Sequence, residues 1–293
     1  MEPPIHEIYI VPKMDHPARL SDISAGMFEM LPSRKSMKKA IDKGLVRVND
    51  RMATTGDWIK GGEKITLLQH PVVSRPNVDL VLEVLFEDDF LAVVNKPAGI
   101  EVSGNHRRIL ENALPQNLRP SQESDALRYP QAIHRLDYPT SGALLIGKTR
   151  GIVAALNHLF ADRKIVKHYL AVTIGDIAEQ GEIEFPVEGK TAHSSYRKLQ
   201  EVASPRFGKL NLVKLEAHTG RRHQLRKHLA ALGSPILGDH QYGTEGLKLS
   251  GKGLYLHAQS LQFRHPVTEE MMVVEAPVPK KYRKLFPAGS FHY

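Results

Sequence analysis

The apolar positions near the middle of the chain predict a strand that is buried on both faces. Residues 143–146 form a short uninterrupted apolar run, which Gly147 closes. Directly before this run, residues 134–142 are mostly polar and contain Pro139 and Gly142, so turn chemistry favours a loop there. The pattern therefore predicts a polar loop supported by a rigid strand, an arrangement that commonly carries functional side chains.

The chain beyond this run shows a helical pattern followed by strand-like alternation. Thr149 can cap a helix whose apolar positions recur at helical spacing. Residues 166–174 then alternate, and residues 181–217 predict several short alternating strands. Because helices are few in this half, we expect mostly antiparallel pairing. The apolar face of the helix consists of Ile152, Val153, Leu156, Leu159 and Phe160.

A second helix is expected to begin at Thr219 or Gly220 and to end at Gly233. Its first turn holds two arginines, where the helix dipole disfavours cations, and a third arginine follows one turn later. This placement indicates an anion nearby. The three arginines are Arg221, Arg222 and Arg226, and the expected buried stripe is Leu225, Leu229 and Leu232.

The N-terminal part of the chain predicts a separate small unit. A helix capped by Ser33 is expected to run to about Asp42, and Gly44 ends it. The cations of this helix are spaced four residues apart without an acidic partner before Asp42, and a phosphate would offset their repulsion. The cationic side chains are Arg34, Lys35, Lys38, Lys39 and Lys43. The other expected elements are a strand over 7–11, a helix over 20–31, and strands over 45–50 and 59–67.

Residues 69–77 carry two prolines and little periodicity, so we interpret them as a linker. The predicted domains are residues 1–75 and residues 76–293. The elements expected between the linker and the central loop are strands over 81–86 and 91–95, a turn over 87–89, and a polar loop with one short helix over 103–130.

The composition is that of a globular protein with a basic balance. The formal net charge of +8 favours a polyanionic partner, and the absence of cysteine excludes disulfides, thiolate metal sites and cysteine nucleophiles. No apolar run approaches the roughly 18 residues of a membrane span, and no signal peptide is recognised at the N-terminus. The expected location is therefore the cytoplasm.

Three stretches of the sequence are similar to the motifs of one enzyme family. They are H-R-L-D-x-x-T-S-G at 134–142, K-x-Y-x-A-x-x-x-G at 167–175, and T-G-R-x-H-Q-L-R-x-H-L-x-x-L-G-x-P-I-L-G-D-x-x-Y-G at 219–243. In this order they resemble the motifs of the RluA-type pseudouridine synthases. Residues 33–50, S-R-K-S-x-x-K-x-I-D-K-G-L-V-R-V-N-D, resemble the small αL-type RNA-binding domain. Arg222 stands where the family more often has Thr or Ser, which leaves the substrate preference open.

The resemblance implies an α+β fold. A catalytic domain of pseudouridine synthase type, with a mixed and mostly antiparallel sheet, would follow a small α+β RNA-binding domain. The implied activity is isomerisation of specific uridines in structured RNA, with ribosomal RNA preferred over transfer RNA as the substrate. Because nothing is added or removed, no cofactor is expected, and we expect a monomer whose partner is RNA.

The resemblance also assigns roles to individual residues. Asp137 would be the essential aspartate, acting as nucleophile or base at the uridine. Arg226 would pair with Asp137 and keep it ionised, and Tyr169 would pack against the flipped uracil and assist proton removal at C5. Arg135 would fill the space left by the flipped nucleotide, and Leu225 would support the base. The expected catalytic residues are Asp137, Tyr169 and Arg226, and the expected substrate-binding residues are Arg135, Leu225, His134 and Arg221.

Metal binding, nucleotide binding and serine hydrolase chemistry have less support from the sequence. His223 and His228 are five positions apart, about 500° on a helix, and no H-E-x-x-H occurs, so no metal site is expected. Neither a phosphate-binding glycine loop nor a G-x-S-x-G motif is present. Two alternatives stay open: a non-catalytic RNA-binding or ribosome-assembly protein that kept the fold, and an RNA hydrolase that uses His134 and Asp137.

Overall fold

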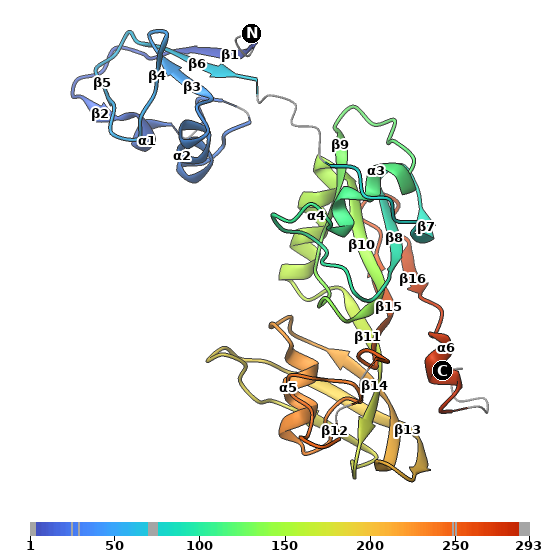
Figure 1. The fold of residues 1–293 in the computed structure, drawn as a ribbon. Coiled ribbons are helices and arrows are strands. Elements are labelled where there is room, and N and C mark those ends of the chain that lie inside the picture. Colours follow the sequence, from blue (N-terminus) through green and yellow to red (C-terminus); the bar gives the residue numbers. More distant parts are fainter. Residues whose placement is uncertain are drawn as a thin grey trace. The chain divides into compact units, whose positions relative to one another are not determined.

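The computed structural model describes residues 4–24, 26–28, 30–69, 76–247, 249 and 251–286 (Figure 1). The chain divides into two compact units, Met1–Arg75 and Pro76–Tyr293. Most of the segment interpreted as a linker, residues 70–75, lies outside the described residues.

The first unit contains a small antiparallel sheet and two helices. Its four-stranded sheet has the order β1-β6-β3-β4, and a separate two-stranded ladder joins β2 to β5. The strands are β1 (Ile5–Ile10), β2 (Ala18–Arg19), β3 (Val46–Val48), β4 (Arg51–Met52), β5 (Trp58–Ile59) and β6 (Lys64–Leu68), and the helices are α1 (Leu20–Ile23) and α2 (Arg34–Asp42).

The α2 helix begins and ends where its sequence predicts. The Ser33 side chain accepts a hydrogen bond from the backbone N–H of Ser36, and the Ser36 side chain accepts one from the backbone N–H of Ser33. This reciprocal cap satisfies two donors that a helix N-terminus leaves free. At the other end Gly44 adopts a φ of +67°, a left-handed conformation that glycine adopts without a side-chain clash. The buried side of α2 is Met37, Ala40 and Ile41, as predicted.

The prediction of a helix over residues 20–31 is wrong beyond its first turn. The α1 helix ends at Ile23, and the described residues that follow, including the buried Phe28, form turns and bends. Leu20, Met27 and Phe28 are buried in the apolar core of this unit, whereas Met30 is 52% exposed, so the segment has no continuous helical stripe.

The second unit is organised around one sheet of ten strands. Its main path is β12-β13-β14-β11-β15-β10-β8-β7, while β16 pairs with β15 and β9 pairs with β10. The pairs are antiparallel except for β10 with β15, so the expected mixed, mostly antiparallel α+β fold is confirmed. The strands are β7 (Glu83–Glu87), β8 (Leu91–Lys96), β9 (Ala126–Ala132), β10 (Ser141–Thr149), β11 (Val166–Ile174), β12 (Gln180–Ile183), β13 (Ser194–Ser204), β14 (Gly208–Ala217), β15 (Leu256–Arg264) and β16 (Met271–Glu275).

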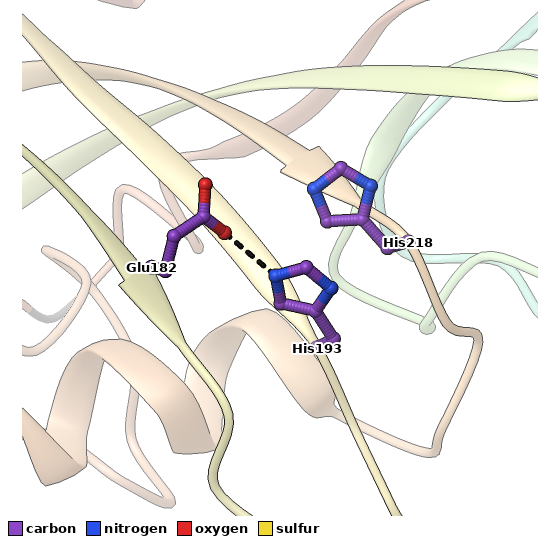
Figure 2. Close-up of side chains that lie close together, drawn as sticks. All are labelled: Glu182, His193 and His218. Atoms are coloured by element: carbon purple, nitrogen blue, oxygen red, sulfur yellow. Dashed lines mark hydrogen bonds and ion pairs between the residues drawn. The ribbon is translucent and has the colours of Figure 1, made fainter.

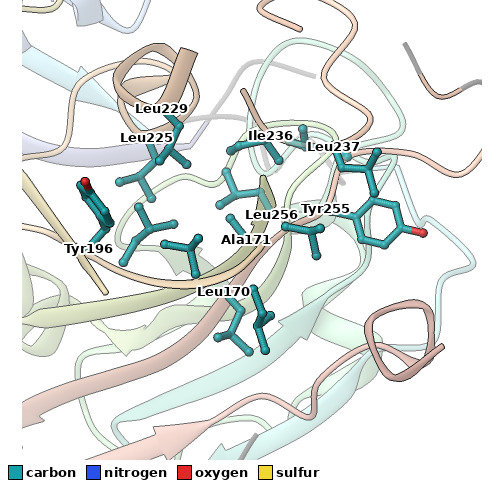
Figure 3. Packing of buried hydrophobic residues seen from close by; sticks show 14 of the residues in the cluster. Leu170, Ala171, Tyr196, Leu225, Leu229, Ile236, Leu237, Tyr255 and Leu256 are labelled. Atoms are coloured by element: carbon teal, nitrogen blue, oxygen red, sulfur yellow. The ribbon is translucent and has the colours of Figure 1, made fainter. Parts of the chain in front are cut away.

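Short helices accompany this sheet. The α4 helix packs beside β10, and Thr149 caps it by accepting a hydrogen bond from the backbone N–H of Ile152. The α5 helix packs on the sheet through an apolar cluster that includes residues of β11 and β13 (Figure 3). The helical elements are η1 (Leu110–Asn112), α3 (Leu114–Asn117), α4 (Arg150–Ala161), α5 (Gln224–Ala231) and α6 (Lys280–Arg283).

The central apolar run forms the most buried strand, as predicted. Each side chain of residues 143–146 is 0% exposed, because Leu144 and Ile146 pack in one apolar cluster and Ala143 and Leu145 pack in another. At the start of β10, Gly142 has a φ of +119°, and a Cβ there would collide with the backbone of Ala258. A glycine is therefore required where the polar loop enters the sheet.

The packing of α5 fixes the direction of its side chains. Leu225 and Leu229 point from the helix into a core that includes Ala171 of β11 and Tyr196 of β13 (Figure 3). Both leucines are buried, as predicted, but Leu232 is 44% exposed and does not belong to the buried stripe. Since the helix ends at Ala231, Leu232 lies at its C-cap rather than on its inner face.

Three further expectations need correction. The segment 103–130 contains the first part of a strand, β9, as well as η1 and α3. Residues 181–217 form mainly two long strands of 11 and 10 residues instead of several short ones. The α5 helix begins at Gln224, four or five residues later than expected, so Arg221 and Arg222 precede the helix and the dipole argument for an anion does not apply to them.

Candidate functional site

Asp137 lies on a tight loop between β9 and β10. Its carbonyl oxygen accepts a hydrogen bond of 2.9 Å from the backbone N–H of Thr140, and the neighbouring Leu136 is 5% exposed and anchors the loop in the core. The buried Lys96 ammonium donates to the carbonyl oxygens of Thr140 at 2.8 Å and Pro97 at 3.0 Å. Burial lowers the pKa of Lys96 to about 8, although the Asp137 carboxylate acts in the opposite direction. The loop is thus held by both its apolar and its polar groups.

Two pockets, of ≈ 550 Å³ and ≈ 470 Å³, meet at Asp137. They share lining residues from the Asp137 loop and from the segment around the start of α5, so the carboxylate faces both. The larger pocket also has Tyr169 of β11 and Leu225 of α5 in its wall. The shared residues are Arg135, Leu136, Asp137, Arg222, His223 and Arg226.

The Asp137 carboxylate has two cationic or potentially cationic neighbours. Its Oδ2 lies 3.5 Å from Arg226 Nη1, and its Oδ1 lies 3.7 Å from His223 Nε2. The Asp137 side chain is 15% exposed, so it is accessible from the pockets while it is shielded from bulk water. An anion in such a place is stabilised by the guanidinium and stays available to a ligand.

Arg226 is held in place by a buried carboxylate. Its Nε and Nη2 atoms donate to Asp239 Oδ2 and Oδ1 at 2.7 and 2.8 Å, a bidentate geometry. Asp239 is 2% exposed and also accepts from the backbone N–H groups of Gln241 and Tyr242. Burial alone would raise the pKa of Asp239, but these hydrogen bonds bring it below its usual value. Arg226 is therefore oriented before any ligand binds.

Tyr169 projects from β11 into the larger pocket. Its strand pairs with β14 and β15, which makes the position rigid. Burial raises the pKa of the Tyr169 hydroxyl well above its ordinary value, and the Asp137 charge raises it further. The hydroxyl consequently stays protonated at neutral pH, and the ring offers an apolar face to a planar ligand.

His134 lines the same pocket but is engaged with the protein. Its Nε2 accepts a hydrogen bond of 3.1 Å from the backbone N–H of Leu145, and its ring packs against Phe160 with centroids 5.0 Å apart. Burial, followed by the nearby Lys167 ammonium, lowers the pKa of His134 to about 4. The imidazole is thus neutral, and its hydrogen bond to Leu145 connects the start of the Asp137 loop to β10.

The arginines at the rim of the pockets are exposed. Arg135 and Arg222 line both pockets, and Arg221 lines the larger one. Arg221 is tethered because its Nε donates to the carbonyl oxygen of Thr191 at 3.0 Å. Leu225, by contrast, is 6% exposed and forms part of the apolar wall. The structure therefore gathers the seven expected catalytic and substrate-binding residues around one cleft.

Two residues of this site escaped the sequence analysis. Asp239 is 13 positions from Arg226 and lies in the same motif, but no role is assigned to it from the sequence. His223 lies within the third motif without an assigned role, yet it is beside Asp137 and has a left-handed φ of +56°. Its Nδ1 is 3.0 Å from the Tyr242 hydroxyl. The signal that could have identified His223 is its place directly before Gln224 in the third motif.

The five cationic residues of the N-terminal helix belong to the first unit. All five are exposed, so they are available to a large ligand. Arg34 forms an ion pair of 2.7 Å with Asp22 of α1, a partner that is distant in sequence and that offsets part of the charge.

One group in the described part of the chain has the residue types and spacing of a metal site. It comprises Glu182, His193 and His218, whose ligand atoms lie within 4.8 Å of one another. His218 lines the larger pocket, but the group does not include Asp137. Separately, no helix among the described residues has the length and apolar character that a bilayer crossing requires.

Comparisons with known proteins agree with this geometry. The model of the RNA pseudouridylate synthase family matches residues 90–231. The chain is 32% identical over 257 residues to an RNA pseudouridine synthase of Bacillus subtilis, covering 82% of this chain and 83% of that protein. It is 31% identical to ribosomal large subunit pseudouridine synthase D of Xanthomonas campestris, with 95% and 91% covered. It is 34% identical to tRNA pseudouridine synthase C of Haemophilus ducreyi, with 72% and 97% covered.

Solved structures show the same fold. A human RNA pseudouridylate synthase domain-containing protein superposes with a TM-score of 0.55 at 24% identity, covering 68% of this chain and 90% of that one. The match to the Xanthomonas relative covers both units, and the motifs that surround Asp137 lie within the matched family region or directly beside it. The chain therefore belongs to the RluA-type family of RNA pseudouridine synthases, which are isomerases that act on RNA.

Proposed function

We propose that this protein converts specific uridines of structured RNA to pseudouridine, with ribosomal RNA as the first candidate substrate and transfer RNA as the second. It would act in the cytoplasm as a monomer without a cofactor. The observation that carries the proposal is the partly exposed Asp137 carboxylate, placed between Arg226 and the Tyr169 wall of a pocket. The relatives in Xanthomonas and Haemophilus, named for ribosomal and transfer RNA, supply the two substrate classes.

The reaction fits a site of this kind. The bond between N1 of uracil and C1′ of the ribose breaks, the uracil turns, and C5 becomes bonded to C1′. The proton of C5 is lost and N1 regains a proton, so the composition does not change. Asp137 supplies the carboxylate at the ribose or at the departing base, and the Arg226 guanidinium pairs with that carboxylate at 3.5 Å.

The pocket walls suit an extruded uracil. Tyr169 offers an aromatic face and Leu225 an apolar one, and both line the larger pocket. Extruding a nucleotide costs a few kcal/mol, which contacts in the pocket and a side chain inserted into the vacated space offset. Arg135 is exposed beside Asp137 and is our candidate for that insertion. Leu225 and Tyr169 would then hold the base while Asp137 reacts.

The alternatives account less well for the site. A module that only binds RNA does not need a carboxylate in contact with an arginine that a second carboxylate orients. A hydrolase that uses His134 needs an imidazole whose pKa is near the working pH. The pKa of His134 is about 4, and its Nε2 is occupied by the Leu145 N–H.

A tritium-release assay tests the proposed function. The full-length protein is incubated, without added cofactor, with cellular RNA labelled at C5 of uridine. Release of tritium without strand cleavage is expected. Tight RNA binding with no release from ribosomal or transfer RNA would favour the non-catalytic alternative, and strand cleavage on a gel would favour the hydrolase.

His223 should influence the pH dependence of the reaction. Burial lowers the pKa of His223 below its ordinary value, and Arg226, Arg222 and Lys227 lower it further against the pull of Asp137. Above this pKa the imidazole is neutral, and as the pH falls through it a cation forms beside Asp137 and reduces the reactivity of the carboxylate. We therefore expect kcat to decline only at a pH more acidic than the ordinary pKa of an imidazole.

In the His223→Gln variant this acidic decline should be weaker, because glutamine does not titrate while its amide can still face Asp137. The measurement is the kcat profile from pH 5 to 8 for both proteins. His158→Gln, an exposed histidine on α4, is the control. Identical profiles for wild type and His223→Gln would show that His223 has no electrostatic role.

The lysines of α2 should contribute to RNA affinity through phosphates. Lys38→Gln/Lys39→Gln is expected to weaken RNA binding and to reduce the slope of log K against log salt by roughly 1 per lost contact. Both side chains are exposed on one helix, and the change leaves the buried side of α2 intact. Filter binding at several salt concentrations measures the slope. The control is Lys13→Gln/Lys60→Gln, a pair of exposed lysines outside α2. An equal loss in both variants would argue against a specific role for α2.

A further inference from the structure

Two histidines and a glutamate converge at one end of three neighbouring strands (Figure 2). Glu182 belongs to β12, His193 directly precedes β13, and His218 directly follows β14. The His193 Nε2 atom lies 2.6 Å from Glu182 Oε2. The two imidazole rings are stacked, with centroids 4.3 Å apart and an interplanar angle of 26°. Each residue can offer a ligand atom, and these atoms lie within 4.8 Å of one another.

The backbone of this group is fixed by several hydrogen bonds. The N–H of His193 donates to Thr219 Oγ1 at 2.9 Å, and its carbonyl oxygen accepts from Gln224 Nε2 at 2.8 Å and from the N–H of His218 at 3.1 Å. The adjacent residues Ser194 and Ala217 are a register pair of β13 and β14. The two imidazoles are therefore placed side by side by the sheet, and only their side-chain torsions are free to adjust.

A second carboxylate orients one of the rings. His218 Nδ1 lies 3.3 Å from Glu216 Oε1, and His218 Nε2 lies 3.0 Å from Ser195 Oγ. An imidazole that binds a metal through one nitrogen commonly donates its other N–H to a carboxylate, which fixes the tautomer and strengthens the ligand. Glu216 is in the position for that supporting role if His218 binds through Nε2.

We propose that Glu182, His193 and His218 form a binding site for a divalent transition metal of the zinc class. Two imidazole nitrogens and one carboxylate oxygen are a donor set that zinc accepts, with water completing the tetrahedron. The side chains are 61%, 34% and 30% exposed, so an ion and its water can reach them. Magnesium and calcium prefer sites made of oxygen ligands and are poor candidates.

A bound ion would stabilise the wall of the larger pocket. The ligands come from the ends of three consecutive strands, and His218 begins the segment that leads to α5. Thr219 and Gln224, which hold the His193 backbone, also line that pocket. The ion would therefore connect β12 and β13 with the segment that carries the third motif. It would be a structural ion, since the group does not include Asp137.

The first test is zinc binding to full-length, tag-free protein that has been stripped of metal. Calorimetry is expected to show one zinc ion bound per chain, no comparable magnesium binding, and weaker zinc binding at pH about 5.5, because protons compete for imidazole. Zinc in excess over its Kd should raise the melting temperature by several degrees. Absence of zinc binding by the wild-type protein would overturn the proposal, and equal binding of magnesium would show that the surface attracts cations non-specifically.

Variants then locate the ion. His193→Ala/His218→Ala should lose zinc binding, and His158→Ala/His240→Ala, two exposed histidines elsewhere, should retain it. If the first pair does not fold, the exposed Glu182→Gln is the substitute, and it should also weaken binding. Glu216→Gln should weaken binding by about 10- to 100-fold without removing a ligand. Zinc binding that survives the first pair, or that is lost equally in the second, would indicate an adventitious ion only and overturn the assignment.

Discussion

Asp137→Asn is expected to abolish pseudouridine formation and to leave RNA binding unchanged. Asparagine has the shape of aspartate, so the loop that Lys96 and Leu136 hold should persist. What is lost is the negative charge at 3.5 Å from Arg226 Nη1, and with it the nucleophile or base. Loss of a group of this kind, acting together with its partners, lowers turnover by roughly ten-thousandfold or more. RNA affinity comes mainly from phosphate contacts, to which an anionic side chain does not contribute.

The measurements are tritium release for turnover and an electrophoretic mobility shift at fixed salt for binding. Asp89→Asn, an exposed aspartate in the turn between β7 and β8, is the matched control and should resemble wild type in both assays. Retained turnover in Asp137→Asn would remove Asp137 from the mechanism. Loss of both activity and binding would mean that Asp137 is needed for the structure of the cleft.

Asp239→Asn is expected to reduce both the stability and the activity. It leaves the Arg226 guanidinium, which is 5% exposed, without its bidentate carboxylate partner. Removal of one member of a buried ion pair costs about 3 kcal/mol of the free energy of unfolding, which corresponds to a fall in melting temperature of roughly 6–12 °C for a unit of this size. Arg226 is then free to turn toward Asp137 and bind it more tightly, so kcat should fall by more than the fraction of unfolded protein explains.

The same variant should show a changed pH dependence of stability. The pKa of Asp239 is held below its usual value, so the native state binds fewer protons than the unfolded state does. The stabilisation is therefore present above the unfolded pKa of about 3.9 and is lost as the pH falls through the lower native pKa. Urea unfolding between pH 3 and 6 should give a shallower rise in unfolding free energy for Asp239→Asn than for wild type.

Asp176→Asn is the control for both measurements with Asp239. Asp176 pairs with Lys209 at 2.7 Å on the surface, where its side chain is 87% exposed. Ion pairs on the surface contribute little to the free energy of unfolding, so this change should leave the melting temperature and kcat nearly unchanged. A similar loss in the two variants would contradict the proposed role of the buried pair.

Local sequence patterns predicted the elements whose hydrogen bonds and apolar contacts are themselves local or strongly periodic. Ser33 caps α2 through Ser36, three residues away, so its sequence alone shows where the helix begins. The apolar run at 143–146 predicts a strand buried on both faces, since an uninterrupted apolar stretch needs cover on each side. The order of the three motifs likewise placed Asp137, Tyr169 and Arg226 in one site, although their roles there stay proposals.

Tertiary contacts decided the features that the sequence pattern missed. The start of α5 depends on Gln224, whose Oε1 accepts from the Thr219 hydroxyl and the Arg221 N–H and so holds this segment as a loop. The polar strand β9 is stabilised by pairing with β10, and its own residues give little indication of it.

The same distinction applies to the cleft and its surroundings. The sequence by itself identified the family and predicted two domains and the loop that presents Asp137, because these features rest on short contiguous motifs. The tertiary structure alone decided that Asp239 orients Arg226 and that His223 adjoins Asp137. The close approach of Glu182 to His193 and His218 is likewise visible only in the tertiary structure. Ion pairs and ligand groups form between residues that strand pairing brings together, and the separation of such residues along the chain carries no periodic signal.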